Sequence, residues 1–158
     1  MSESTKMTKE LIQLIESFEV SPKWVNAIIL QESSWKNYAL RFEPNYPYLF
    51  QVDQFAKKLV ITSATETTCQ KMSWGLGQIM GALAREQGHD GPMGQLFKPK
   101  YNILHMCKRI QTLKKISPRM DDIFAMYNGG PGALIKKKDG IFKNQVYVDS
   151  VKKKLNIV

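Results

Sequence analysis

The sequence predicts a mostly helical fold, organised as a single domain over residues 1–158. Three observations lead to this expectation. Apolar residues recur at helical spacing along most of the chain, and prolines and glycines separate these stretches. No repeat or low-complexity linker divides the chain. Its 158 residues, of which 43% are hydrophobic, are enough for one hydrophobic core.

Two helices are expected in the N-terminal part. The first spans residues 8–18, and its apolar side is formed by Leu11, Leu14, Ile15 and Phe18. The second begins at Ser21-Pro22, because Ser is a good N-cap and Pro suits the first helical turn, and it runs to about Trp35. Glu32 follows Ile28 by one turn and therefore lies on the apolar stripe of this helix.

The middle of the chain gives weaker signals. Residues 36–50 are rich in Asn, Pro and Tyr and predict a loop, and a helix is expected over residues 52–59. The β-branched and polar residues over 60–72 predict a small β excursion, either flexible or two-stranded. Ser73 has the character of an N-cap, so we expect a helix that begins there and ends near Gln87.

The C-terminal part predicts four further helices. They span roughly residues 100–116, 118–127, 131–138 and 143–155. Asn128-Gly129-Gly130 is typical of a helix end, and Pro131 of a helix start. The last helix is amphipathic, with an apolar side formed by Val146, Val148, Val151 and Leu155.

The formal net charge of +9 favours a polyanionic partner, such as nucleic acid, an anionic membrane or a cell wall. The helices lack a recognition pattern with Arg, Asn and Gln on one face, so nucleic acid is not expected as the partner. We interpret Lys136-Lys137-Lys138 and Lys152-Lys153-Lys154 as solvated faces rather than dedicated sites.

The two cysteines, Cys69 and Cys107, do not have the spacing of metal ligands, and only two histidines accompany them. We therefore expect no metal or other cofactor and interpret both cysteines as free thiols, with a single disulfide as the alternative. The first residues carry no apolar stretch typical of a signal peptide, and no apolar run is long enough to span a membrane. These features lead us to expect a soluble protein that is made inside a cell, and we expect it to be a monomer.

Glu32 is the main candidate for acid–base chemistry. A carboxylate on an apolar stripe is costly unless it is paired or protonated, so we expect burial to raise the pKa of Glu32. Cleavage of a glycoside needs such an acid to protonate the leaving oxygen. A single Glu at a helix end is more often a paired or solvated side chain, so this interpretation depends on the other motifs.

Two further motifs follow Glu32 along the chain. The run Ser73-Trp74-Gly75-Leu76-Gly77-Gln78 lacks the Lys-Ser/Thr ending and the preceding strand of a phosphate-binding loop. The run Tyr127-Asn128-Gly129-Gly130 taken alone fits a helix–helix turn. An aromatic ring beside an amide also suits a sugar, because the ring can stack on a pyranose face while the amide bonds acetamido and hydroxyl groups.

In this order the motifs resemble those of lytic transglycosylases and goose-type lysozymes, specifically the catalytic domain of soluble lytic transglycosylases. The matching segments are Glu32-Ser33, Gly75-Leu76-Gly77-Gln78-Ile79 and Ala125-Met126-Tyr127-Asn128-Gly129-Gly130. Arg41-Phe42-Glu43-Pro44 resembles the phage-borne members. The resemblance covers about residues 22–140 and implies a lysozyme-like helical domain.

The resemblance also implies a role for each matching residue. Glu32 would be the catalytic acid, Ser33 would orient substrate or a water, Gln78 and Asn128 would hold N-acetyl groups, and Tyr127 would line the cleft. The sequence departs from the family pattern at two positions. Gly77 replaces the usual Met and is expected to widen the cleft floor, and Met126 stands between Ala125 and Tyr127.

The implied substrate is the glycan strand of bacterial peptidoglycan, cleaved at the β-1,4 bond between N-acetylmuramic acid and N-acetylglucosamine. Goose-type lysozymes, which hydrolyse this bond, have an acid at the position of Met80. Its absence here favours lytic transglycosylation, which gives 1,6-anhydro products with one acid. Hydrolysis with Glu43 or Glu66 as a second acid is the alternative, although we expect Arg41 to hold Glu43 in a structural pair.

The resemblance to phage-borne members also bears on the biological setting. We expect a phage endolysin that acts on the wall after release from the cytoplasm, or an enzyme carried by a virion. A module of another class, which binds peptidoglycan without cleaving it or serves as a structural part of a virion, is the remaining alternative.

Overall fold

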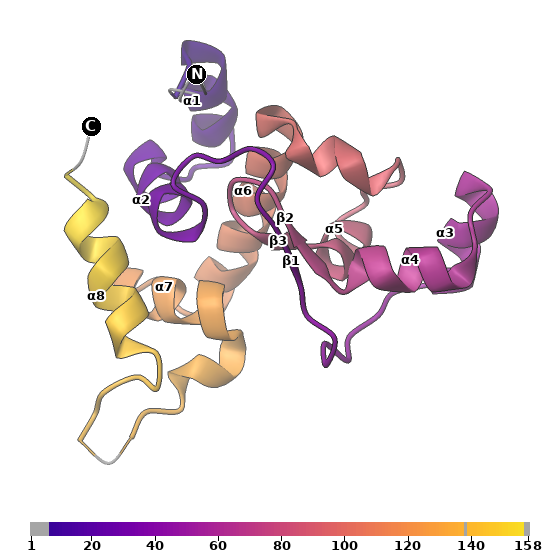
Figure 1. Ribbon diagram of the computed structural model, residues 1–158. Coiled ribbons are helices and arrows are strands. Elements are labelled where there is room, and N and C mark those ends of the chain that lie inside the picture. The colour runs from indigo at the N-terminus through magenta and orange to yellow at the C-terminus, as the bar shows by residue number, and fades with distance from the viewer. Residues whose placement is uncertain (1–6, 138, 157–158) are drawn as a thin grey trace. The chain divides into compact units, whose positions relative to one another are not determined.

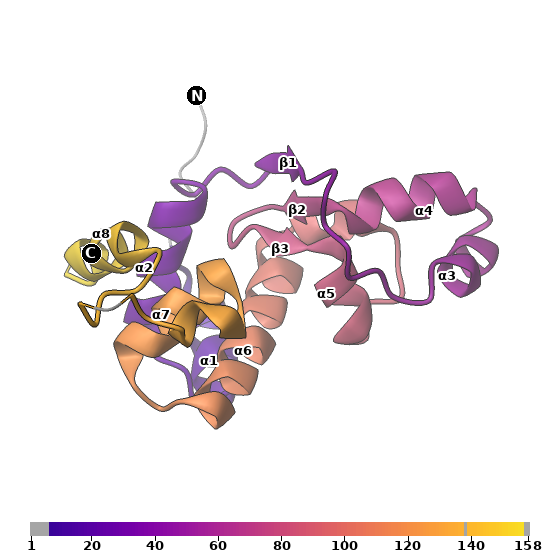
Figure 2. The same ribbon diagram turned by 90° about the horizontal axis from the view of Figure 1, so that it is seen from below.

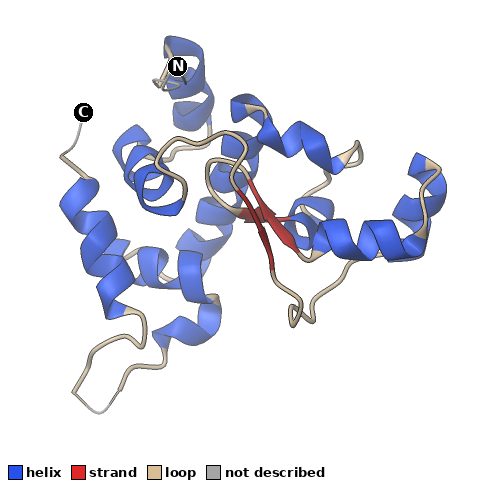
Figure 3. Cartoon of the chain, in the orientation of Figure 1, coloured by secondary structure: helices blue, strands red, loops and turns tan. Residues whose placement is uncertain are grey.

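The computed structural model describes residues 7–137 and 139–156. Over these residues the chain has eight α-helices, two short 3₁₀ helices and one three-stranded sheet (Figures 1 and 3). The predicted mostly helical fold is therefore confirmed. The N-terminal residues on which the expectation about a signal peptide rests, and Lys138 of the predicted lysine run, lie outside the described residues.

Contacts divide the chain into two compact units. We call Glu32–His105 the sheet unit, and the described residues of 7–31 and 106–156 the helical unit. Each unit is described by itself. Within the described residues, no helix has both the length and the apolar character needed to cross a membrane.

The sheet unit is built around a small antiparallel sheet. Its strands, in the spatial order β1-β2-β3, are β1 (Leu40–Phe42), β2 (Met72–Trp74) and β3 (Ile79–Met80). Its helices are α3 (Val52–Leu59), α4 (Ser63–Gln70), α5 (Gly81–Glu86), η1 (Met93–Phe97) and the first part of α6 (Pro99–Ile116). Helices α3 and α4 pack against each other beside the sheet (Figure 2).

The predicted β excursion over residues 60–72 was wrong in its position, because most of this stretch is helix α4. Thr62 begins the helix as an N-cap, and its hydroxyl accepts a hydrogen bond of 3.1 Å from the Thr65 N–H. The Thr68 hydroxyl donates a hydrogen bond of 2.9 Å to the Ala64 carbonyl one turn earlier. These local hydrogen bonds offset the weak helix propensity of threonine.

The helix predicted from Ser73 to Gln87 was also wrong over its first half. Ser73 lies in β2, and a tight turn leads from β2 into β3 before α5 begins at Gly81. The turn has left-handed backbone at Gly75 (φ 67°) and Gln78 (φ 49°), which interrupts any helix. Strand β1, which pairs with β2, lies in the stretch predicted as a loop.

The helical unit is formed by segments that are far apart in the sequence. These are α1 (Lys9–Ser17), α2 (Pro22–Glu32) up to Gln31, α6 from Met106, α7 (Met120–Gly129), η2 (Pro131–Leu134) and α8 (Gln145–Lys154). The predicted apolar stripes meet in its core, where the fully buried side chains include Ile15, Ile28, Ile29, Met106, Ile110, Phe124, Val148 and Val151. The α6 side chain of Gln111 also donates to the Phe18 carbonyl after α1, at 2.8 Å.

Three expectations for these helices need correction. Helix α2 ends at Glu32, three residues early, because Ser34 and Trp35 have left-handed backbone with φ of 50° and 63°. The helix predicted over 131–138 is only the short η2. Val146, predicted on the apolar side of the last helix, is 81% exposed.

Candidate active site

Glu32 is the last residue of α2, and its side chain is partly exposed. The next residue, Ser33, is buried, and its hydroxyl donates a hydrogen bond of 2.8 Å to the carbonyl of Leu76. Leu76 lies in the turn between β2 and β3. This hydrogen bond therefore fastens the helix end that carries Glu32 to the second predicted motif.

The β2–β3 turn is held by Asn102 of α6, whose side chain is fully buried. The Asn102 amide donates to the carbonyls of Trp74 (2.7 Å) and Leu96 (2.9 Å), and its oxygen accepts from the Gly77 N–H at 2.8 Å. A Cβ at Gly75 would lie only 2.5 Å from the Asn102 amide nitrogen. A glycine is thus required where Asn102 approaches the turn.

The Gln78 side chain also takes part in this arrangement. Its amide nitrogen donates to the carbonyls of Gly75 (3.0 Å) and Ala39 (3.3 Å), and its oxygen accepts from the Ser73 hydroxyl at 2.9 Å. Both amide hydrogens are therefore engaged within the protein. Gln78 shapes the turn and ties it to the start of β1. Its predicted contact with an N-acetyl group stays a prediction.

Two carboxylates were predicted as alternatives for a second acid, and the structure gives them different surroundings. Glu43 forms an ion pair of 2.8 Å with Arg41, as the sequence predicted, and 35% of its side chain is exposed. Glu66 has no exposed side-chain surface, and neither does its partner Arg85. A carboxylate without exposed surface cannot reach a glycan, so the geometry argues against Glu66 as a catalytic acid.

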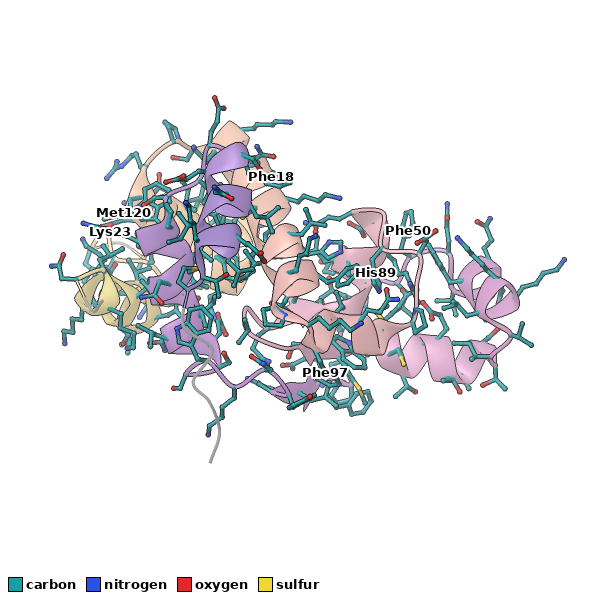
Figure 4. All side chains as sticks on the ribbon, turned by 90° about the horizontal axis from the view of Figure 1, so that it is seen from above. Phe18, Lys23, Phe50, His89, Phe97 and Met120 are labelled. Atoms are coloured by element: carbon teal, nitrogen blue, oxygen red, sulfur yellow. The ribbon has the colours of Figure 1, made fainter. Side chains whose placement is uncertain are left out.

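Glu66 and Arg85 are the centre of a buried polar network in the sheet unit. Both Glu66 oxygens accept from Arg85, at 2.8 and 3.0 Å, and Gln70 adds a third hydrogen bond of 2.9 Å. Arg85 also donates to the carbonyls of His89 and Gly91. Figure 4 labels His89 and Phe50, which come from two distant segments of this unit; Gln70 joins the network to the backbone of Phe50.

Tyr127 and Asn128 belong to the helical unit, where they lie in the last turn of α7. Tyr127 is only 5% exposed, and the Arg109 guanidinium lies 5.1 Å from the centre of its ring. Arg109 also donates to the Tyr127 carbonyl at 2.6 Å, which satisfies a carbonyl at the helix end. The Asn128 side chain is exposed.

The sequence interpretation missed Asn102 and Arg109, each of which holds one of the predicted motifs within its own unit. Asn102 lies one turn before Met106 on the apolar stripe of α6, and a polar residue on such a stripe indicates a buried hydrogen-bonding role. Arg109 gives no comparable signal, because its partners on α7 are 17 and 18 residues away.

The carboxyl group of Glu32 is able to supply acid–base chemistry. Among the described residues, no three or more His, Cys, Asp and Glu side chains are grouped as a metal site would need. Cys69 and Cys107 are free thiols, as predicted. Burial raises the pKa of the Cys107 thiol to about 12, and burial followed by the nearby Glu66 charge raises the pKa of Cys69. Neither thiol is activated as a nucleophile.

Comparison with known proteins identifies the family. The family model described as the transglycosylase SLT domain matches residues 11–146. The chain belongs to the transglycosylase SLT family. No curated protein and no solved structure shows a significant match to the chain.

Membership of the SLT family confirms several expectations. The mostly helical fold with its small sheet is the lysozyme-like fold of an SLT domain. The family consists of lytic transglycosylases, so this SLT domain is an enzyme that acts on peptidoglycan. The matched range, 11–146, includes the three predicted motifs but does not by itself assign a role to any residue.

Proposed function

We propose that this SLT domain cleaves the β-1,4 bond between N-acetylmuramic acid and N-acetylglucosamine by lytic transglycosylation, with Glu32 as the only catalytic carboxyl group. The Glu32 carboxyl protonates the glycosidic oxygen, which leaves as the C4 hydroxyl of N-acetylglucosamine. The acetamido oxygen of the muramoyl residue bonds to C1 as the old bond breaks.

The second half of the reaction returns the proton. The Glu32 carboxylate removes the proton of the muramoyl C6 hydroxyl, and this oxygen bonds to C1 and displaces the acetamido oxygen. The product is a 1,6-anhydro sugar, and no water is consumed. One carboxyl group therefore acts first as acid and then as base.

The observation that carries this proposal is the anchored helix end at Glu32. The buried hydrogen bond from Ser33 to Leu76 fixes the position from which Glu32 acts. The two carboxylates predicted as alternatives for a second acid form ion pairs within the protein, Glu43 with Arg41 and Glu66 with Arg85. A mechanism with one acid needs neither of them.

The remaining residues would bind the glycan strand. Ser33 gives its hydroxyl proton to Leu76 and can therefore act toward substrate or water only as an acceptor. The exposed amide of Asn128 is suited to an acetamido or hydroxyl group, and Tyr127 would line the cleft. Gln78 would contribute mainly through the turn that it holds, unless its amide exchanges a backbone partner for the substrate.

Replacement of Glu32 tests the catalytic assignment. Glu32→Gln keeps the shape of the side chain but cannot transfer a proton, so we expect kcat on purified peptidoglycan to fall by about 10²–10⁴ or more. The melting temperature should stay close to that of the wild type. Glu43→Gln serves as the matched control and should keep kcat within about twofold if Glu32 acts alone. Retained activity of a folded Glu32→Gln enzyme would disprove the assignment.

Mass spectrometry of the released muropeptides tests the reaction type. Transglycosylation gives products that end in 1,6-anhydro-N-acetylmuramic acid, whereas hydrolysis gives reducing ends that are heavier by one water. Reducing ends together with a large loss of kcat in Glu43→Gln would show a hydrolase that uses Glu43, which is the partly exposed alternative.

We further propose that the enzyme is a monomeric phage endolysin, made in the host cytoplasm and released to the wall, with a virion-carried enzyme as the alternative setting. This proposal is supported by the resemblance of Arg41-Phe42-Glu43-Pro44 to phage-borne members and by the net charge of +9, which favours an anionic wall. An endolysin should clear permeabilised cells from outside, whereas a virion enzyme should be present in purified particles.

A further inference from the structure

The C-terminal end of α7 is held by two side chains from other helices of the same unit. The carbonyls of Met126 and Tyr127 accept hydrogen bonds from Arg109. The carbonyl of Ala125 accepts one of 2.9 Å from the Asn144 amide nitrogen. The same nitrogen donates at 3.0 Å to the Asn128 side-chain oxygen. An amide nitrogen has two hydrogens, so both donors of Asn144 are engaged at this helix end.

Asn144 lies at a position where an Asn side chain ordinarily caps the following helix. It is the N-cap residue of α8, and Asn is a preferred N-cap, yet its side chain makes no capping hydrogen bond to that helix. The side chain instead turns back to α7, which packs against α8 (Figure 1). The absence of a side chain at Gly129 permits this approach, because a Cβ there would lie 3.3 Å from the Asn144 nitrogen.

The orientation of the Asn144 amide follows from its surroundings. The two neighbours, the Ala125 carbonyl and the Asn128 side-chain oxygen, are both placed as acceptors. A flipped Asn144 amide would direct its oxygen toward the Ala125 carbonyl, which can only accept. In the observed orientation the Asn144 oxygen is buried and has no hydrogen-bond partner among the described residues. Leaving this oxygen unpaired costs stability, and the two hydrogen bonds that Asn144 donates to α7 offset that cost.

This arrangement also decides which group Asn128 presents to solvent. Its side-chain oxygen is taken by Asn144, and the amide nitrogen lies on the opposite side of the planar group. Asn128 is exposed, so the donor end of its amide faces away from Asn144 and toward solvent, where a ligand could accept from it.

We propose that Asn144 is a positioning residue that holds Asn128 as a hydrogen-bond donor, so that this end of α7 selects an acceptor on the glycan, such as an acetamido carbonyl oxygen. The proposal rests on the proposed role of Asn128 in substrate binding. Asn144 acts through Asn128 and need not touch the substrate itself.

Replacement of Asn144 by Asp tests the proposal. Asp has the same shape and is as good an N-cap as Asn, so the start of α8 should not be weakened. The Ala125 carbonyl loses its hydrogen bond, so the melting temperature should fall by about 2–4 °C without loss of the fold. A carboxylate cannot donate to Asn128, so the Asn128 amide should turn and present its oxygen to the substrate. We expect KM for a soluble tetrasaccharide of alternating N-acetylglucosamine and N-acetylmuramic acid to rise about tenfold, as for the loss of one hydrogen bond. We expect kcat to stay within about twofold.

A double-mutant cycle separates this role from a structural one. The four proteins are the wild type, Asn144→Asp, Asn128→Ala and the double variant, and Gln145→Glu places the same charge change on the neighbouring residue as a control. We expect Asn128→Ala to raise KM about as much as Asn144→Asp, and the double variant to be no worse than Asn128→Ala. Gln145→Glu should leave KM unchanged.

Several outcomes would overturn the proposal. An unchanged KM in Asn144→Asp would do so, and so would an equal rise of KM when Asn144→Asp is added to Asn128→Ala. A loss of kcat that tracks a lower melting temperature would show a structural role only. An unchanged KM in Asn128→Ala would remove the basis of this inference but leave the proposed mechanism intact, because that mechanism is tested separately by Glu32→Gln and by the muropeptide products.

Discussion

Replacement of Glu66 by Gln should distinguish this structural carboxylate from Glu32, the carboxylate that we propose is catalytic. The Glu66–Arg85 pair is bidentate, with distances of 2.8 and 3.0 Å, and neither side chain has exposed surface. Water therefore does not screen the charge of Arg85 when its partner loses the negative charge. Breaking a buried pair on one side costs about 3–5 kcal/mol. For a chain of this length, we expect the melting temperature to fall by about 6–20 °C.

The same variant should keep its catalytic activity. Circular dichroism would first define a temperature at which Glu66→Gln is fully folded, and kcat on peptidoglycan would be measured there. We expect kcat within about twofold of the wild type, because Glu66 cannot reach the glycan. Asp53→Asn is the matched control: this exposed carboxylate accepts one hydrogen bond from Ser63, so its loss should change stability by less than about 1 kcal/mol.

One result would contradict the structural role of Glu66, and another would contradict the stability that we assign to the Glu66–Arg85 pair. A folded Glu66→Gln enzyme that has lost its activity more than about a hundredfold would make Glu66 a catalytic acid and revive the two-acid mechanism. A melting temperature within about 2 °C of the wild type would show that the buried pair does not stabilise the sheet unit as its geometry indicates.

Three further predictions concern the sheet unit and the thiols. Gly75→Ala should lower stability by at least about 1–2 kcal/mol, because φ is 67° and the new Cβ would collide with Asn102, whereas Gly94→Ala, with no neighbour within 4 Å, should be close to neutral in the same thermal melts. Burial, followed by the Arg85 charge, lowers the pKa of His89. The unfolded state therefore binds a proton first as pH falls below about 6.5, so the wild type should lose more thermal stability between pH 7.5 and 5 than His89→Gln, and equal losses would contradict this. The Cys107 thiol, with its pKa of about 12, should react with a thiol reagent only after denaturation, while the half-buried Cys69 should react slowly in the native protein.

Long helices with a clear apolar period could be predicted from the sequence. Helices α1, α2 and α6 begin within a residue of their expected positions, because each buries a regular stripe and starts at a recognisable signal. The prediction failed where the pattern was short. Strand β1 has three exposed residues, and it is a strand only because it pairs with β2, whose partner residues lie 30 to 34 positions later. No local pattern carries that information.

Helix α4 illustrates a different failure. Its threonines predict β structure, but two of its turns bury Glu66 and Gln70, which bond to Arg85 and to the backbone at Phe50. The partners that make helix the better choice come from other parts of the chain. Tertiary contacts therefore overrode the local propensity of this segment.

The sequence by itself determined the family, and it predicted which residues carry the chemistry, because both depend on the identity and order of Glu32-Ser33, Gly75–Gln78 and Tyr127-Asn128 along the chain. The tertiary structure decided which donors, acceptors and charges remain free to bind a substrate. Only the folded chain shows that Glu66 forms an ion pair with Arg85, and that the Asn144 amide donates a hydrogen bond to the Asn128 oxygen. The physical reason is that a hydrogen-bond donor or a charge acts according to its nearest partners, and these partners lie between 16 and 19 residues away in the sequence.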